Sequence, residues 1–62
     1  MLLVSEFISK LDGFTYWHAL DSDTLNNISD IELSNNEYEI TEIGTINNKI
    51  YIYCKKVLTD VK

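Results

Sequence analysis

The side chains able to perform acid–base or nucleophilic chemistry at neutral pH are few in this sequence. His18 is the single histidine and Cys54 the single cysteine, and they are far apart in the chain. A catalytic pair would need the thiol within hydrogen-bond reach of the imidazole, together with an oxyanion hole. Cys54 lies in the middle of a β-rich run, where a small buried hydrophobe is typical. We therefore predict no catalytic residue, and the protein is expected not to be an enzyme.

Carboxylates occur in close pairs, of which Asp21 and Asp23 most resemble the start of a calcium-binding loop. Such a loop also needs a glycine for its sharp turn and a glutamate at its end, and the residues that follow supply neither at the required spacing. One cysteine and one histidine cannot provide the four protein ligands of a structural zinc site. Gly13 and Gly44 are single and far apart, so no glycine-rich phosphate loop is present. The sequence predicts neither a metal nor another cofactor.

Charge is the clearest global property of the chain, which has 10 acids, 5 lysines and no arginine, for a net charge of −5. Binding to nucleic acid through phosphates, or to an anionic membrane, needs basic side chains, so we expect neither a direct nucleic-acid partner nor a membrane partner. Residues 21–42 hold most of the acids and no base. This pattern indicates a solvated face or, alternatively, an acidic surface that competes for a cationic site on another protein. The acidic residues concerned are Asp21, Asp23, Asp30, Glu32, Glu37, Glu39 and Glu42.

Hydrophobic spacing predicts the N-terminal elements that must position these groups. An apolar stripe at helical spacing predicts a helix over residues 3–12. Residues 14–20 have strand propensity, although both of their faces are partly apolar. Residues 21–24 resemble a turn or helix cap, and residues 25–28 a single helical turn or a plain loop. A short strand is predicted around Ile31 and Leu33, which alternate with acids. The helical stripe comprises Val4, Phe7, Ile8 and Leu11.

The C-terminal third predicts a long β-hairpin. Residues 38–46 and 49–58 are β-rich and are separated by Asn47 and Asn48, which tolerate the positive φ angles of a two-residue type I′ turn. This turn would set a regular antiparallel register along the whole hairpin. The predicted pairs are Ile46–Lys49, Thr45–Ile50, Gly44–Tyr51, Ile43–Ile52, Glu42–Tyr53, Thr41–Cys54, Ile40–Lys55 and Glu39–Lys56.

That register gives the hairpin two apolar faces, which is the most informative feature of the sequence. One face is aliphatic, and it comprises Ile43, Ile50, Ile52, Cys54 and Leu58. The other is rich in tyrosine, and it comprises Tyr38, Ile40, Ile46, Tyr51, Tyr53 and Val57. We expect the helix to cover the aliphatic face and Tyr51 to cover the bare backbone of Gly44. Tyrosine suits a half-wet surface and is enriched at binding hot spots. The residues predicted to bind a partner are Tyr16, Trp17, Tyr38, Tyr51 and Tyr53.

We predict an α+β fold in which an N-terminal helix packs on a small antiparallel sheet of three or four strands ending in a long β-hairpin. Residues 1–62 are expected to form a single small domain. A chain of this length buries only about 60% of its unfolded surface, so further stabilisation is expected from outside the core. With one cysteine, no intrachain disulfide can supply it. Association is therefore expected, and we predict a homodimer.

These features favour a small acidic non-enzymatic interaction protein that binds a protein partner, with inhibition of that partner as one form of the hypothesis. The alternative is a nucleic-acid-mimicking inhibitor of a DNA- or RNA-binding protein. Abundant asparagine and isoleucine without arginine, proline or glutamine are typical of an AT-rich coding sequence and hint at a viral, phage- or mobile-element-encoded regulator or anti-defence inhibitor. The start lacks the basic region of a signal peptide, and no run is apolar enough to span a membrane. A cytoplasmic location is expected, since the one cysteine is free.

Overall fold

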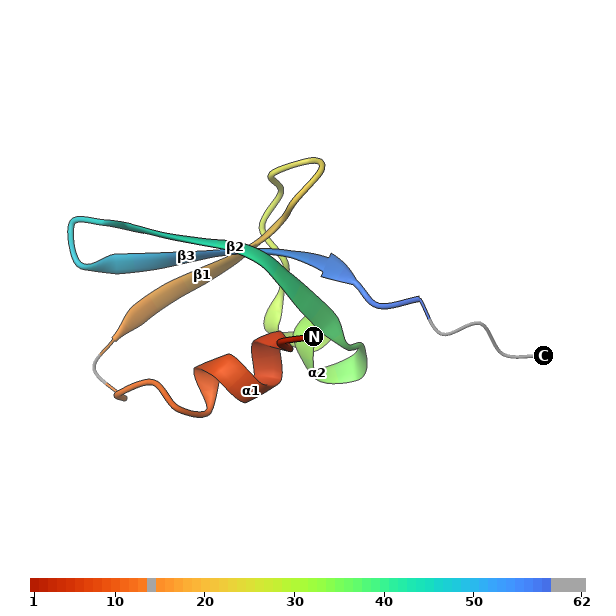
Figure 1. Cartoon of the computed structure of the whole chain (residues 1–62), viewed down its shortest axis with the longest axis horizontal. Coiled ribbons are helices and arrows are strands. Elements are labelled where there is room, and N and C mark those ends of the chain that lie inside the picture. Colours follow the sequence, from red (N-terminus) through yellow and green to blue (C-terminus); the bar gives the residue numbers. More distant parts are fainter. Residues whose placement is uncertain (14, 59–62) are drawn as a thin grey trace.

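A computed structural model describes residues 1–13 and 15–58 of the chain and shows a small α+β arrangement of two short helices and three strands (Figure 1). Phe14, the first residue of the predicted 14–20 strand, and residues 59–62 of the predicted domain lie outside the described residues. Within the described residues, no helix has both the length and the apolar character needed to cross a membrane. The elements in chain order are α1 (Val4–Ile8), β1 (Tyr16–Asp21), α2 (Asp30–Asn35), β2 (Tyr38–Ile46) and β3 (Lys49–Lys56).

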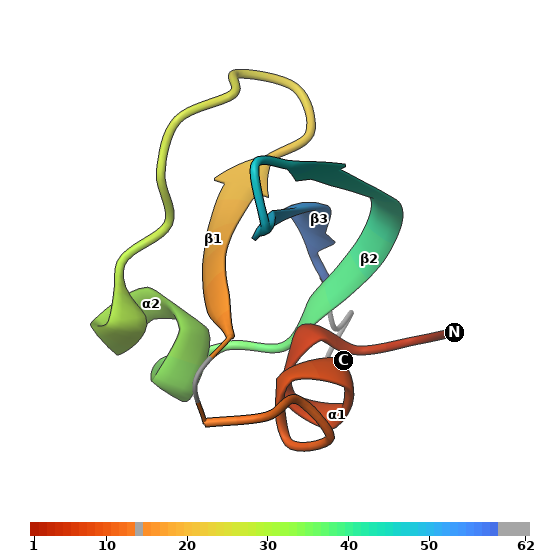
Figure 2. The ribbon, with the colours of Figure 1, turned by 90° about the vertical axis from the view of Figure 1, so that its left-hand side faces the viewer.

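The three strands form one mixed sheet in the order β1-β3-β2, with β3 in the centre (Figure 2). β2 and β3 form the antiparallel hairpin, whereas β1 runs parallel to β3. The prediction of an all-antiparallel sheet is therefore wrong, and the described residues contain no fourth strand. β3 has apolar residues on both faces, and its Ile52 and Cys54 are fully buried. As the central strand, β3 forms backbone hydrogen bonds with both β1 and β2.

The hairpin turn is the part of the sheet that local sequence predicted best. Asn47 and Asn48 have φ angles of 50° and 66°, as a type I′ turn requires. The next five predicted pairs, from Ile46 opposite Lys49 to Glu42 opposite Tyr53, are confirmed.

Thr41 then interrupts the ladder as a β-bulge, and the remaining register differs from the prediction by one residue. Ile40 lies opposite Cys54, and Glu39 opposite Lys55 instead of Lys56. The hydroxyl of Thr41 donates to the carbonyl oxygen of Tyr53 at 3.1 Å. Because its proton is used there, the hydroxyl of Ser22, 2.6 Å away, is the donor to Thr41 Oγ1. These two contacts give the extra residue polar partners.

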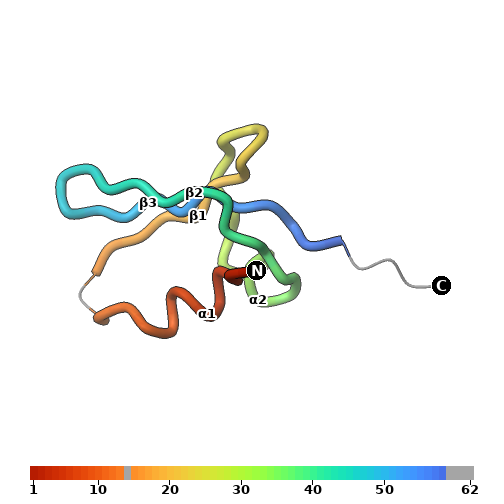
Figure 3. The backbone as a smooth tube through the Cα atoms, in the orientation of Figure 1, coloured from red at the N-terminus to blue at the C-terminus, as the bar shows by residue number. Residues whose placement is uncertain are grey.

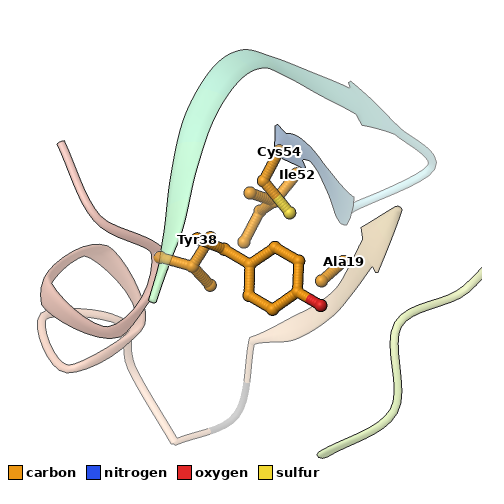
Figure 4. Packing of buried hydrophobic residues seen from close by; sticks show 5 residues of the cluster. Ala19, Tyr38, Ile52 and Cys54 are labelled. Carbon is orange, nitrogen blue, oxygen red and sulfur yellow. The ribbon is translucent and has the colours of Figure 1, made fainter. Parts of the chain in front are cut away.

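The bulge changes which side chains form the core. Residues opposite each other in a ladder share a face, so Ile40 joins Cys54 on the face that packs against α1. Tyr38 moves to this face with it and is only 7% exposed, so its predicted place beside Tyr51 and Tyr53 is wrong. Figure 4 shows the Tyr38 ring lying across the core from β2 toward β1. The buried core cluster comprises Val4, Ala19, Tyr38, Ile52 and Cys54.

The first helix is shorter than the predicted 3–12 segment. After Ile8 the hydrogen bonds change from the α-helical spacing to the shorter spacing of a 3₁₀ turn. The amide of Lys10 donates to the carbonyl of Phe7, and the amide of Leu11 donates to the carbonyl of Ile8, both at 3.1 Å. The hydroxyl of Ser9 also bonds the carbonyl of Glu6 at 2.7 Å and so occupies a helical acceptor. Of the predicted apolar stripe, only Val4 is fully buried. The other three residues of the stripe are half-buried.

The segment around Ile31 and Leu33 is helical, so the prediction of a strand there is wrong. Ser29 caps α2, and its hydroxyl accepts the amide of Glu32 at 3.2 Å. Asp30 and Glu32 lie in the first turn, where negative charge complements the helix dipole. The spacing of Ser29 and Glu32 is that of a capping box, and this local signal outweighs a short alternation of apolar and acidic residues.

Residues 25–28 form a plain loop, which is one of the two predicted alternatives. The segment between β1 and α2 rises on one side of the sheet before returning to α2 on the other (Figure 3). On its way back it pairs with the outer edge of β1, where the amide of Ile28 donates to the carbonyl of Ala19 at 2.9 Å. At the opposite edge, the amide of Ile40 donates to the carbonyl of Leu2 at 2.9 Å. Both edges of the sheet are therefore partly covered by extended chain.

Candidate functional site: the aromatic sheet face

One face of the sheet carries α1 and α2, and the other carries neither (Figure 1). The strand register places side chains of all three strands on this second face, and we call the cluster of aromatic and apolar residues there the aromatic face. Tyr16 and Ile46, next to the hairpin turn, are 73% and 60% exposed. His18 is exposed, and the remaining three side chains are half-buried. The aromatic face comprises Tyr16, His18, Leu20, Ile46, Tyr51 and Tyr53.

A stacked pair of rings lies at the centre of this face. His18 and Tyr51 are opposite each other in the parallel ladder, and their ring centroids are 5.5 Å apart with an interplanar angle of 21°. On the β2 side, Tyr51 lies opposite Gly44, where an added Cβ would meet no atom within 4 Å. The expected covering of Gly44 by Tyr51 is therefore wrong. Gly44 instead leaves open space beside the Tyr51 ring, which stacks on His18 of β1.

Charge is distributed unevenly along the aromatic face. Lys49 lies at the turn end, between Tyr16 and Ile46. Glu42 lies at the other end, opposite Tyr53. Beyond it, the ammonium of Lys55 is 3.5 Å from the carboxylate of Asp23 in the β1–α2 loop. Because Lys55 already has this partner, the face has a basic end at Lys49 and an acidic end at Glu42.

The structure brings together three of the five residues predicted to bind a partner. Tyr16, Tyr51 and Tyr53 share the aromatic face. Tyr38 is a core residue, and Trp17, opposite Ile50, is half-buried on the helix-covered face. The sequence did not predict His18 as part of this surface, although its alternation with Tyr16 is the signal that could have found it.

The seven predicted acidic residues are spread over several elements. Two hydrogen bonds to the Asp21 carboxylate, from the amides of Asp23 at 2.8 Å and Thr24 at 3.1 Å, hold its pKa below the ordinary value. Asp23 pairs with Lys55, and Glu32 accepts a hydrogen bond from Tyr38. The remaining four are Asp30 in α2, Glu37 before β2, and Glu39 and Glu42 within β2.

Cys54 and His18 lie on opposite faces of the sheet. Cys54 is fully buried, and its thiol donates to the carbonyl of Leu20 at 3.5 Å. Burial raises the pKa of this thiol above its ordinary value, which favours the neutral form. Among the described residues, no group of three or more histidine, cysteine, aspartate or glutamate side chains is arranged to hold a metal.

Comparison of the chain with models of protein families, with curated proteins and with solved structures finds no match.

Proposed function

We propose that this protein is a small non-enzymatic interaction protein that binds another protein chain through its aromatic face. The observation that carries the proposal is a sheet face with three tyrosines that neither helix covers. Tyrosine side chains are enriched at binding hot spots because they bury a large ring while the hydroxyl can still reach water. Soluble monomers seldom leave a contiguous apolar surface of this kind uncovered.

A second copy of the chain is the partner that the charges of this face favour. Two copies can meet face to face through a twofold axis that lies in the interface plane. This axis can run parallel to the strands or perpendicular to them. The first arrangement brings Lys49 against the partner's Lys49, which is repulsive. The second reverses the strand direction and brings Lys49 to the end of the partner that carries Glu42. We therefore propose a dimer whose strands run in opposite directions across the interface.

A larger protein partner would bind the same aromatic face and would compete there with the second copy. Binding through this face is the way in which the chain would inhibit such a partner. The nucleic-acid mimic has weaker support. Asp21, Asp23 and Glu32 are engaged by partners within the chain, and they belong to three different segments, the end of β1, the loop that follows it and α2. A mimic would need its carboxylates to be free and aligned for one cationic cleft.

The dimer is tested by measuring mass in solution with light scattering and sedimentation equilibrium. The expected species has twice the 7.2 kDa chain mass at micromolar concentration. Tyr51→Ala is expected to raise the dimer dissociation constant about 5- to 30-fold, the effect of removing a hot-spot side chain worth about 1–2 kcal/mol. Ile31→Ala is the matched control, because it removes an apolar side chain that is 72% exposed on α2.

The arrangement of the two copies is tested by exchanging the charges at the two ends of the face. Lys49→Glu and Glu42→Lys should each weaken the dimer about fivefold, and the double variant should recover most of the loss. A chain that stays monomeric throughout the concentration range would overturn the dimer. If the single variants weaken dimerisation and the double variant does not recover it, the strand direction proposed across the interface is wrong.

A further inference from the structure

A second candidate site lies on the other side of the sheet from the aromatic face, and it does not depend on dimer formation. A half-open pocket of about 510 Å³ is lined by residues of α1, α2 and the first halves of β1 and β2. Its volume falls within the range of about 300–1,000 Å³ that small-molecule sites occupy. Its apolar wall is formed by Val4, Ile8 and Leu33, and its aromatic wall by Trp17 and Tyr38.

The lining of the cavity carries negative charge. Among the described residues that line it, Asp30 is the one carboxylate and none is an amine, and the other polar side chains are serines, an asparagine and Tyr38. Within the described residues, no hydrogen bond or ion pair engages the Asp30 side chain. The Tyr38 hydroxyl is directed to the carboxylate of Glu32, which adds a second negative group close to this wall.

An anionic ligand would therefore meet repulsion here, and a neutral apolar ligand would gain no attraction from the exposed Asp30 carboxylate. A cation can form an ion pair with the carboxylate. It can also interact with the aromatic wall, since ammonium groups are attracted to tryptophan and tyrosine rings. The net charge of −5 on the whole chain also raises the local concentration of cations near the surface.

We propose that this cavity binds a small organic cation, consisting of an ammonium group on an apolar body. The ammonium group would lie at Asp30 beside the rings of Trp17 and Tyr38. The apolar body would contact Val4, Ile8 and Leu33.

The experiment uses three probes that share one apolar chain and differ in charge: hexylamine, hexanol and hexanoate, compared at constant ionic strength and neutral pH. Trp17 is the only tryptophan of the protein, so its fluorescence reports directly on the cavity wall. Hexylamine should change this fluorescence saturably, and it should bind about fivefold more tightly than hexanol, as expected for one exposed charge pair. Hexanoate should bind most weakly.

Asp30→Asn should lower the affinity for hexylamine toward that for hexanol and leave the affinity for hexanol unchanged. Glu37→Gln is the matched control, because it removes one exposed carboxylate outside the cavity lining and should change hexylamine affinity less than twofold. Amide NMR shifts induced by hexylamine should centre on Ser5 and Ser34, which line the cavity. The proposal is overturned if hexanoate binds as tightly as hexylamine, if the two variants behave alike, or if the probes leave Trp17 and the lining amides unaffected.

Discussion

The phenol of Tyr38 donates a hydrogen bond to the carboxylate of Glu32, with 3.2 Å between Oη and Oε2. This contact joins a buried residue of β2 to the first turn of α2, a helix that has no fully buried residue of its own. Burial and the neighbouring carboxylate raise the pKa of Tyr38, so the hydroxyl keeps its proton and acts as the donor. Together with Leu33, which packs against the core cluster, this hydrogen bond holds α2 over the cavity.

Tyr38→Ala should unfold most of the protein at 25 °C. Emptying a buried aromatic position costs about 3–5 kcal/mol, which is comparable with the total stability of so small a domain. Tyr38→Phe, which removes only the hydroxyl, should cost about 1 kcal/mol. Urea unfolding measures both, with Ile31→Ala, which truncates an exposed side chain of α2, as a control expected to change stability by less than about 0.5 kcal/mol. A folded Tyr38→Ala variant would show that the core lies elsewhere.

Asn48 should be replaceable by glycine with a gain in stability. Both turn residues have positive φ, and glycine at the second position is the preferred sequence of a type I′ turn. Asn48→Gly should therefore stabilise the fold by a few tenths of a kcal/mol up to about 1 kcal/mol, whereas Asn48→Ala should cost about 1 kcal/mol. Thermal unfolding of the two variants compares them directly. Equal melting temperatures would contradict the turn geometry.

Asp21→Asn should reduce the sensitivity of stability to acid. Hydrogen bonds from the amides of Asp23 and Thr24 hold the pKa of Asp21 below its ordinary value in the folded state. The carboxylate therefore stabilises the fold above about pH 4, and this contribution is lost as the pH falls through the lowered pKa. Urea midpoints near pH 6 and near pH 3 should show a gap between wild type and variant that shrinks in acid. A gap that stays constant or widens on acidification would contradict this role.

Cys54→Ser should destabilise the protein and leave dimerisation of the folded fraction unchanged. A hydroxyl replaces a fully buried thiol, at a cost of about 1–3 kcal/mol. In the wild type, a thiol reagent should label Cys54 slowly until urea unfolds the chain. Because burial raises the thiol pKa, the neutral form stabilises the fold at lower pH, and this contribution is lost as the pH rises through the raised pKa. A folded variant that no longer dimerises would place the thiol in the interface.

Local sequence was sufficient for the elements whose geometry depends on neighbouring residues. The Asn47–Asn48 turn and the five pairs beside it follow from positive φ and two-residue alternation, and the structure has them. These pairs also put Tyr51 and Tyr53 on one face. The helix at residues 30–35 has a local signal as well, the spacing of Ser29 and Glu32, which competes with a strand-like alternation of apolar and acidic residues in the same segment.

Only the tertiary structure decided where the rest of the face and the core lie. The parallel pairing of β1 with β3 brings Tyr16 and His18 beside Tyr51, and no pattern within either segment specifies that neighbour. The bulge at Thr41 turns Tyr38 from the tyrosine-rich face into the core. One extra residue reverses every side chain beyond it, because alternation in a strand has a period of two. Such a bulge is favoured only when the burial of Tyr38 and the contacts of Thr41 with Ser22 and Tyr53 stabilise the fold by more than the interrupted ladder costs. Those contacts come from distant parts of the chain, so local sequence does not specify the bulge.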